Sequence, residues 1–244
     1  MRKHTLALFG ATSLLIATPV LAEDKPELGL SGSGQAGYSN TTGDTSTQAI
    51  YGSLGLEYTQ KMYKLKAKFD ATNKEEDGNR TDERYVGDLQ GNLYFSDYQK
   101  AYGFGQFKAV NDRFSDIELS TYTIAGLGYN FIKRKDMILT GEAGAGYQSD
   151  NYYKNSDTKD MSQAIAKLYG NFEYAFNPNV RFLQNLTVFT GEKQTNTESN
   201  TGLKVLFNSH FNMRINYQYR HNSKPAEDKK NVNTETMITL GYDF

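Results

Sequence analysis

The chain has 244 residues, and its 27 Lys and Arg against 28 Asp and Glu give a formal net charge of −1. This balance lacks the basic excess that a nucleic-acid-binding protein carries. The absence of Cys excludes disulfides and thiolate metal sites, and the 18 Tyr, 14 Phe and 22 Gly with only 4 Pro and no Trp are typical of a strand-rich protein.

The first element in chain order is a signal peptide, residues 1–22. A basic start, Arg2-Lys3, precedes an apolar run over residues 6–20, and the small residue Ala22 follows. Signal peptidase recognises a basic start, a short apolar region and small residues before the cut. We therefore expect export, cleavage after Ala22 and a mature domain over residues 23–244.

Beyond the signal peptide, apolar and polar residues alternate with a period of two, as strands with two different faces do. No stretch reaches the roughly 20 apolar residues of a membrane helix. We predict twelve strands, each long enough for the roughly 9–11 residues of a tilted membrane strand. They are 28–39, 47–59, 62–72, 82–95, 98–110, 117–131, 136–148, 162–176, 179–190, 197–208, 210–221 and 233–244.

The connections between these segments are predicted to alternate in length. Short ones fall at Gln60-Lys61, Ser96-Asp97, Lys133-Arg134-Lys135, Asn177-Pro178 and Ser209, and longer polar ones at 40–46, 73–81, 111–116, 149–161, 191–196 and 222–232. Outer-membrane barrels have short periplasmic turns, longer outer loops and an even strand number. The sequence therefore predicts an all-β fold, a transmembrane antiparallel up-and-down β-barrel of twelve strands.

The last segment ends on Phe244, and this aromatic end resembles the C-terminal assembly signal of outer-membrane barrels. A second resemblance rests on Asp112-Arg113-Phe114-Ser115, on Gly126-Leu127-Gly128-Tyr129 and on the segment 139–147, LTGEAGAGY. With these motifs the chain resembles the YdiY-like family of salt-induced outer-membrane proteins. The resemblance implies an exported outer-membrane barrel, and it supplies no catalytic or ligand residues because the family has no assigned biochemical function.

The parity of the strands predicts which charged side chains face the lumen, because charges are unfavourable in hydrocarbon. Tyr102 and Phe104 are also predicted to face inward, over glycines at 126, 128, 144 and 146. The expected cations are Lys64, Lys66, Lys68, Arg84, Lys100, Lys108, Lys167, Arg181, Lys204, Arg214 and Arg220, and the expected anions are Glu57, Asp70, Asp88, Glu118, Glu142, Glu173, Glu235 and Asp243. Across the third hairpin we expect Lys66 opposite Asp88, and Asp70 opposite Arg84.

Motifs that carry chemistry are few. The run 32–37, GSGQAG, matches a nucleotide-binding fingerprint but lies inside a predicted strand, without the helix that the motif requires. For metals, the mature chain offers His210 and His221 at opposite ends of one strand, and an acidic stretch with Glu75, Glu76, Asp77, Asp82 and Glu83 that is typical of a solvated loop. We expect no cofactor and no metal.

Three functions are compatible with these features. The first is a narrow, weakly selective passive pore for ions or small polar solutes, with at most a mild preference for anions. The second is a non-conducting structural or surface-interaction barrel, and the third is an outer-membrane lipid hydrolase that uses His221 and Ser223. The first two are favoured and an enzyme is not expected. We expect residence in the outer membrane of a Gram-negative bacterium, in contact with lipids, lipopolysaccharide and the barrel-assembly machinery, but with no nucleic acid.

Overall fold

The structure is a computed structural model that describes residues 27–41, 47–154 and 156–244, so the predicted signal peptide, residues 1–22, lies outside the described residues. It contains twelve strands: β1 (Gly29–Thr41), β2 (Thr47–Thr59), β3 (Tyr63–Glu76), β4 (Asn79–Tyr94), β5 (Ala101–Asp112), β6 (Ile117–Lys133), β7 (Met137–Tyr152), β8 (Met161–Asn177), β9 (Val180–Gly191), β10 (Thr195–Leu206), β11 (Phe211–Asn222) and β12 (Val232–Asp243). A single turn of 3-10 helix, η1 (Arg113–Ser115), joins β5 to β6.

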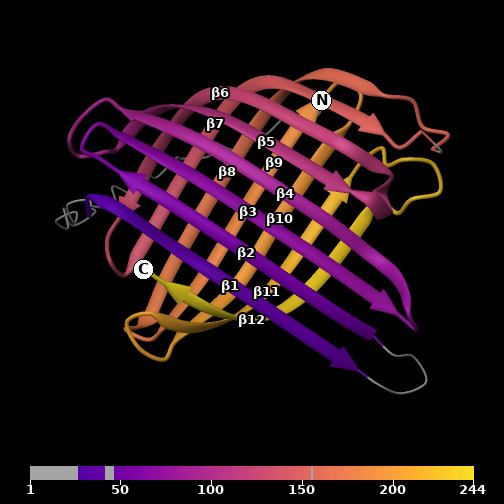
Figure 1. Ribbon diagram of the computed structural model, residues 1–244. Coiled ribbons are helices and arrows are strands. Elements are labelled where there is room, and N and C mark those ends of the chain that lie inside the picture. The colour runs from indigo at the N-terminus through magenta and orange to yellow at the C-terminus, as the bar shows by residue number, and fades with distance from the viewer. Residues whose placement is uncertain (1–26, 42–46, 155) are drawn as a thin grey trace, which may run out of the picture.

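Each strand pairs antiparallel with the next along the chain, and β1 pairs with β12, so the sheet closes on itself (Figure 1). The predicted twelve-stranded up-and-down barrel is therefore confirmed. The closing ladder is short, from Ser33 with Asp243 to Ala36 with Leu240. Closure of the sheet is the condition for placing it in hydrocarbon.

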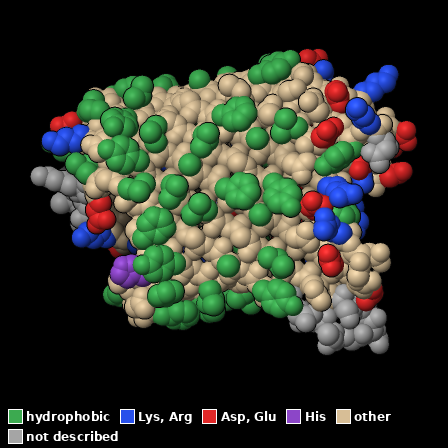
Figure 2. Space-filling view, viewed as in Figure 1, with side chains coloured by type: hydrophobic (Ala, Val, Ile, Leu, Met, Phe, Trp, Pro, Cys, Tyr) green, Lys and Arg blue, Asp and Glu red, His purple; other side chains and the backbone are tan. Residues whose placement is uncertain are grey.

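The outer surface of the barrel is an apolar belt. Because successive side chains of a strand point to opposite faces, one face of each strand is available to lipid. Large apolar side chains such as Leu54 on β2, Leu89 on β4, Leu127 on β6, Leu168 on β8 and Ile238 on β12 are all exposed. Figure 2 shows hydrophobic side chains spread over the flank of the barrel, with Lys, Arg, Asp and Glu gathered at its two ends. This distribution is that of a transmembrane barrel.

An aromatic girdle marks the end of the barrel at which the chain finishes, called here the terminal end. Its exposed rings belong to residues at the ends of strands or in the adjoining connections: Tyr58, Tyr63, Phe95, Tyr129, Phe131, Tyr174, Phe176, Phe207, Phe211, Tyr242 and Phe244. Girdles of this kind lie at the boundary between hydrocarbon and headgroups. The opposite end, where β1 finishes and β12 begins, is called the loop end. In the described residues no helix is long and apolar enough to cross a membrane.

The seam between β1 and β12 ends on Phe244. Backbone atoms of Gly32 and Phe244 exchange two hydrogen bonds, of 2.7 and 2.9 Å, beyond the ladder that pairs Ser33 with Asp243. A Cβ atom on Gly32 would lie 2.4 Å from Cζ of the Phe244 ring, so glycine is needed for this approach. The run 32–37 therefore lies inside a strand, as predicted, and its Gly32 contacts Phe244 at the seam.

The hairpin β3–β4 is longer than predicted. The expected loop over residues 73–81 is wrong, because both strands continue to a two-residue turn, Asp77-Gly78, with φ of 49° and 77°. Positive φ at both turn positions matches the twist of a tight hairpin, and Asp-Gly is a preferred pair there. Consequently Glu75 and Glu76 belong to β3, and Asp82 and Glu83 to β4, rather than to a solvated acidic loop.

This turn also changes the register of the hairpin. Lys68, not Lys66, lies opposite Asp88, and Arg84 lies opposite Thr72 instead of Asp70. The predicted pairs are therefore wrong. The turn is centred between residues 77 and 78 rather than at 77, and a bulge between Lys74 and Glu75 adds one more residue, so the partners of Tyr63 to Lys74 shift by two. A shift by two preserves the faces, so the side chains stay on the predicted side of the sheet.

Connection lengths at the two ends also differ from the prediction. At the loop end, residues 77–78 and 192–194 form short turns, whereas at the terminal end the connection between β4 and β5 spans residues 95–100. Strands rather than loops therefore extend past the apolar belt at the loop end. Lys100 lies in a connection and Glu118 is exposed next to a bulge, so neither is on the regular inward face of a strand.

Candidate functional site

Within the residues that the structure describes, two cavities lie in the lumen. The outer cavity, at the loop end, has a volume of about 330 Å³ and is lined by residues of β4, β5, β6, β10 and β11 and of the connection 223–231. The inner cavity lies deeper in the lumen and has a volume of about 240 Å³. Arg84 and Glu198 line both cavities, so the wall between the cavities includes this pair.

Ion pairs cross the barrel at this wall. Nζ of Lys108 on β5 lies 2.5 Å from Oε2 of Glu198 on β10, and Nη2 of Arg84 on β4 lies 3.5 Å from the other oxygen of the same carboxylate. β10 is not a neighbour of β4 or β5 in the sheet, so these contacts span the lumen. We call Arg84, Lys108 and Glu198 the cross-barrel bridge. Lys108 also lies over the rings of Tyr122 and Phe189, at 5.9 and 5.5 Å from their centroids, which fixes its position.

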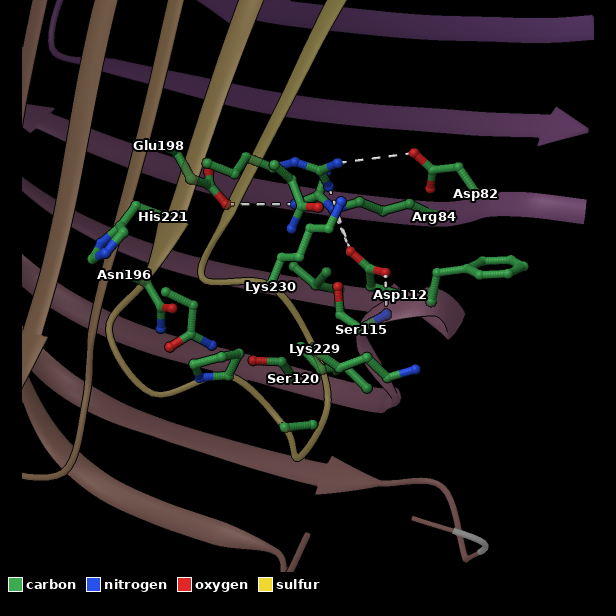
Figure 3. Close-up of a pocket in the computed structure, with 18 of the residues that line it drawn as sticks. Asp82, Arg84, Asp112, Ser115, Ser120, Asn196, Glu198, His221, Lys229 and Lys230 are labelled. Carbon is green, nitrogen blue, oxygen red and sulfur yellow. Dashed lines mark hydrogen bonds and ion pairs between the residues drawn. The ribbon is translucent and has the colours of Figure 1, made fainter. Parts of the chain in front are cut away.

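Above the cross-barrel bridge, a second set of ion pairs faces the outer cavity. Arg84 Nε and Arg220 Nη1 both lie 3.4 Å from Oδ2 of Asp112, and Arg220 Nη2 lies 3.9 Å from Asp82. Figure 3 shows Asp82, Arg84 and Asp112 together with Glu198 and with Lys230 from the connection 223–231. Positive and negative groups thus alternate on one wall of the cavity.

Below the bridge, a buried cluster fills part of the lumen. Nζ of Lys167 on β8 lies 2.8 Å from Glu142 on β7 and donates a 2.7 Å hydrogen bond to Gln106 on β5. The Glu142 carboxylate also accepts hydrogen bonds of 2.8 Å from Gln90 on β4 and from the hydroxyl of Tyr102 on β5. The Lys167 and Glu142 side chains are only 2% and 1% exposed. This cluster joins four strands and narrows the lumen.

The aromatic side chains of β5 lie against glycines of the neighbouring strands. A Cβ atom on Gly128 would lie 2.2 Å from the Tyr102 ring, and one on Gly126 would lie 2.8 Å from the Phe104 ring. The rings can therefore lie flat along the wall only where the side chain beside them is absent. In this position Tyr102 reaches Glu142, and Phe104 lies 4.6 Å below Nζ of Lys167.

The connection 223–231 covers part of the mouth at the loop end. Its Ala226 is buried, its Lys229 lies 3.2 Å from Asp116 in the β5–β6 connection, and the backbone amide of Glu227 donates a 3.0 Å hydrogen bond to Thr158 in the β7–β8 connection. Three connections of the loop end are thereby joined over the outer cavity.

Comparison with known proteins places this chain in a family. The family model described as "Protein of unknown function, DUF481" matches residues 34–244. The chain belongs to this family. It is 25% identical over 210 residues to a protein described as "Uncharacterized protein YdiY" of Escherichia coli (strain K12), covering 86% of this chain and 81% of that protein. The predicted YdiY-like family is confirmed.

Solved structures resemble this DUF481 chain in fold. The NanC porin matches with a TM-score of 0.50 and 14% identity, over 88% of this chain and 98% of that one. The outer membrane channel COG4313 from Pseudomonas putida F1 matches with a TM-score of 0.49 and 12% identity, over 93% of this chain and 98% of that one. The first likeness is one of fold, a closed β-barrel.

The DUF481 barrel pairs several of the remaining predicted lumen residues, most of them near the terminal end, whereas Lys68 and Asp70 line the inner cavity. Lys64 lies 2.7 Å from Glu57, Lys68 lies 2.8 Å from Asp70, and Arg181 lies 3.4 Å from Glu173. Asp243 contacts both Lys204, at 2.5 Å, and Arg214, at 3.0 Å. Lys66 and Asp88 line the inner cavity, and Glu235 lies opposite Gln218, another residue of its lining.

The candidate site of this DUF481 protein also includes residues that the sequence analysis missed. Asp112 is predicted in a connection, Asp82 at the start of the strand 82–95 but within an acidic stretch typical of a loop, and Glu198 is not assigned to a face. Glu198 shares the parity of Lys204 on the same strand, so that parity would have placed it in the lumen; the polar Thr197, Ser199 and Thr201 on the opposite face obscure this locally. For Asp82, the Asp77-Gly78 pair is the signal that would have extended the hairpin.

Of the two residues expected in a lipid hydrolase, His221 and Ser223, the second is bonded to β10. Ser223 Oγ accepts a 2.8 Å hydrogen bond from the backbone amide of Thr195, and its own amide donates to the Thr195 carbonyl. Among the described residues, no hydrogen bond joins His221 to Ser223, and no group of three or more His, Asp or Glu side chains is arranged to hold a metal ion. Ser223 therefore anchors the connection 223–231 to β10.

Proposed function

We propose that this DUF481 chain is a narrow, weakly selective passive pore for ions or small polar solutes in the outer membrane of a Gram-negative bacterium. The observation that carries the proposal is the lumen itself: two polar cavities in line, with the cross-barrel bridge between them. A barrel of twelve strands is wider than the eight-stranded kind that side chains fill, yet narrower than the 16–18 strands of an open channel. Side chains therefore decide whether solutes pass.

The balance of lumen charges supports weak selectivity. Asp82, Asp112 and Glu198 add to the anionic wall, while Lys100 is not on a lumen-facing strand position. The excess of cations predicted from the sequence therefore disappears. Most of the remaining charges are also paired with opposite charges at short range, so neither sign dominates the field along the lumen.

The test is single-channel recording of the refolded mature protein and its Glu198→Ala variant. Removing the Glu198 carboxylate opens the wall between the cavities, so we expect a larger conductance than in the wild type. The control is Glu173→Ala, which removes a carboxylate that pairs with Arg181 near the terminal end, away from the bridge. Heat-modifiable gel mobility checks that each variant folds. Equal conductance of wild type and Glu198→Ala would refute the role of the bridge.

A second candidate is a non-conducting structural or surface-interaction barrel. The specific observation in its favour is that bonds cross the lumen at two levels while the connection 223–231 covers the mouth. A protein that gives no current in planar bilayers, with or without Glu198, would favour this candidate. Neither proposal assigns a catalytic activity, and both place the belt against lipid and lipopolysaccharide.

A further inference from the structure

The outer cavity has two chemically different walls and a roof. One wall carries Asp82, Arg84, Asp112, Glu198 and Arg220, and the other carries neutral groups, among them Ser120, Tyr122 and Asn196. The roof is the connection 223–231. A volume of about 330 Å³ lies at the lower end of the range for small-molecule sites, roughly 300–1,000 Å³, so the cavity suits one small solute.

The ion pairs on the charged wall are loose. Contacts of Arg84 and Arg220 with Asp112, Asp82 and Glu198 measure 3.4–3.9 Å, whereas a well-formed charge-assisted hydrogen bond measures about 2.7–2.9 Å. Lys167 and Glu142 in the buried cluster do reach 2.8 Å. Each guanidinium has five N–H donors, so both arginines retain donors that can bind a solute.

A third cation completes this wall. Lys230 lines the outer cavity and, among the described residues, has no ion-pair partner, unlike its neighbour Lys229. Figure 3 shows the Lys230 side chain reaching toward Arg84. Three cations and three carboxylates therefore meet at this wall, and the roof adds Asp228 and Lys229, of which Lys229 pairs with Asp116.

Such an arrangement of charges selects solutes by how their charges are distributed rather than by their net charge. A solute with a single negative charge would be attracted by the arginines but repelled by the carboxylates of Asp82, Asp112 and Glu198. A solute with a single positive charge would be attracted by the carboxylates but repelled by the arginines. A zwitterion can satisfy both signs at once, because its two groups lie apart. We propose that the outer cavity binds a small zwitterion, a solute with one ammonium and one carboxylate, with the carboxylate toward Arg84, Arg220 and Lys230 and the ammonium toward Asp82 and Asp112.

This inference names a class of solute for the proposed pore. Passage of the solute through the barrel rests on the proposed function, but binding of the solute can be measured without recording a current. The test is isothermal titration of the refolded mature protein in detergent micelles with three probes of similar length: γ-aminobutyrate, pentanoate and pentylammonium. We expect γ-aminobutyrate to bind at least about tenfold more tightly than either singly charged probe. Equal affinities, or no binding of the zwitterion, would overturn the inference.

Two variants localise the site. Arg220→Gln removes a guanidinium from the charged wall, and we expect it to weaken γ-aminobutyrate binding about tenfold or more. Asp82→Asn is also expected to weaken γ-aminobutyrate binding. Asp82 lies 3.9 Å from Nη2 of Arg220, the longest of the ion-pair distances at this wall, so we expect this variant to disturb folding less than changes at the other charged residues. The matched control is Arg80→Gln, because Arg80 pairs with Glu83 at 2.8 Å and does not line the cavity. Unchanged binding in both site variants would refute the location. If the zwitterion binds but the protein gives no current in bilayers, the proposed pore is refuted and this inference is not. If the protein conducts but does not bind the zwitterion, this inference is refuted and the pore is not.

Discussion

The buried pair of Lys167 and Glu142 gives the sharpest prediction about stability. We consider Lys167→Met, which keeps most of the side-chain volume beside Phe104 but removes the ammonium. The Glu142 carboxylate would then remain buried with the neutral donors Gln90 and Tyr102, each at 2.8 Å. Removing one partner of a buried ion pair costs about 3–5 kcal/mol, and the two remaining donors place the expected loss near the lower bound, about 3 kcal/mol.

The double variant Lys167→Met with Glu142→Gln separates charge from packing. With both charges removed, we expect at least half of the lost stability to return, because a neutral pair carries no uncompensated charge. Lys68→Met is the matched control, since the Lys68 side chain is 58% exposed and its pair with Asp70 is expected to contribute about 1 kcal/mol or less. Urea unfolding in lipid vesicles, followed by far-UV circular dichroism, measures all four proteins. A single-variant loss of under about 1 kcal/mol would refute the assignment of a buried, dependent charge.

Three further predictions concern assembly and the mouth. Deleting Phe244 removes its two backbone hydrogen bonds to Gly32, so we expect a lower outer-membrane yield than for Ile238→Ala; equal yields would remove the role of the last residue. Gly128→Val places methyl groups in the Tyr102 ring, and we expect slower refolding on heat-modifiable gels, whereas wild-type kinetics would contradict that packing. Asp116→Asn frees the connection 223–231 at Lys229, so we expect more frequent opening events in single-channel records; an unchanged record would show that this ion pair does not hold the connection.

The structure also changes one comparison that the sequence suggests. Asp243 is a natural control for Phe244 by its inward parity, but its carboxylate contacts Lys204, Arg214 and Asn212. A change at Asp243 therefore removes several contacts of its own. Ile238, which faces outward on the same strand, tests the aromatic end without that complication.

The sequence predicts the barrel well because the strand period determines which side chains face lipid. The same parity places Tyr102 over Gly128, since both residues lie on adjacent strands and their contact depends only on neighbouring ladders. Register was less accessible, because the Asp77-Gly78 turn and the bulge between Lys74 and Glu75 together move the partners of Tyr63 to Lys74 by two. The sequence analysis does not predict the parts of the strands that extend past the apolar belt, because their residues are polar and have the composition of loops.

Most contacts that define the candidate site cannot be predicted from strand parity. Glu198 meets Lys108 across the lumen, and this contact depends on the cross-section of the closed barrel, not on pairing between neighbouring strands. No local pattern in the sequence encodes that cross-section. The contact of Arg220 with Asp112 likewise joins strands that are not neighbours, β11 and β5. Arg84 and Asp112, in contrast, are direct ladder partners on β4 and β5, and this pair was missed because Asp112 was expected in a connection.

The most direct test of the pore is single-channel recording of the wild-type mature protein in planar bilayers, first in symmetric and then in asymmetric potassium chloride. The cross-barrel bridge and the buried cluster predict a small conductance, because side chains occupy the lumen at two levels. The balanced charges of the wall predict a reversal potential near zero in the salt gradient. A large conductance with strong cation selectivity would contradict this account of the lumen, and the complete absence of current from folded, inserted protein would contradict the pore.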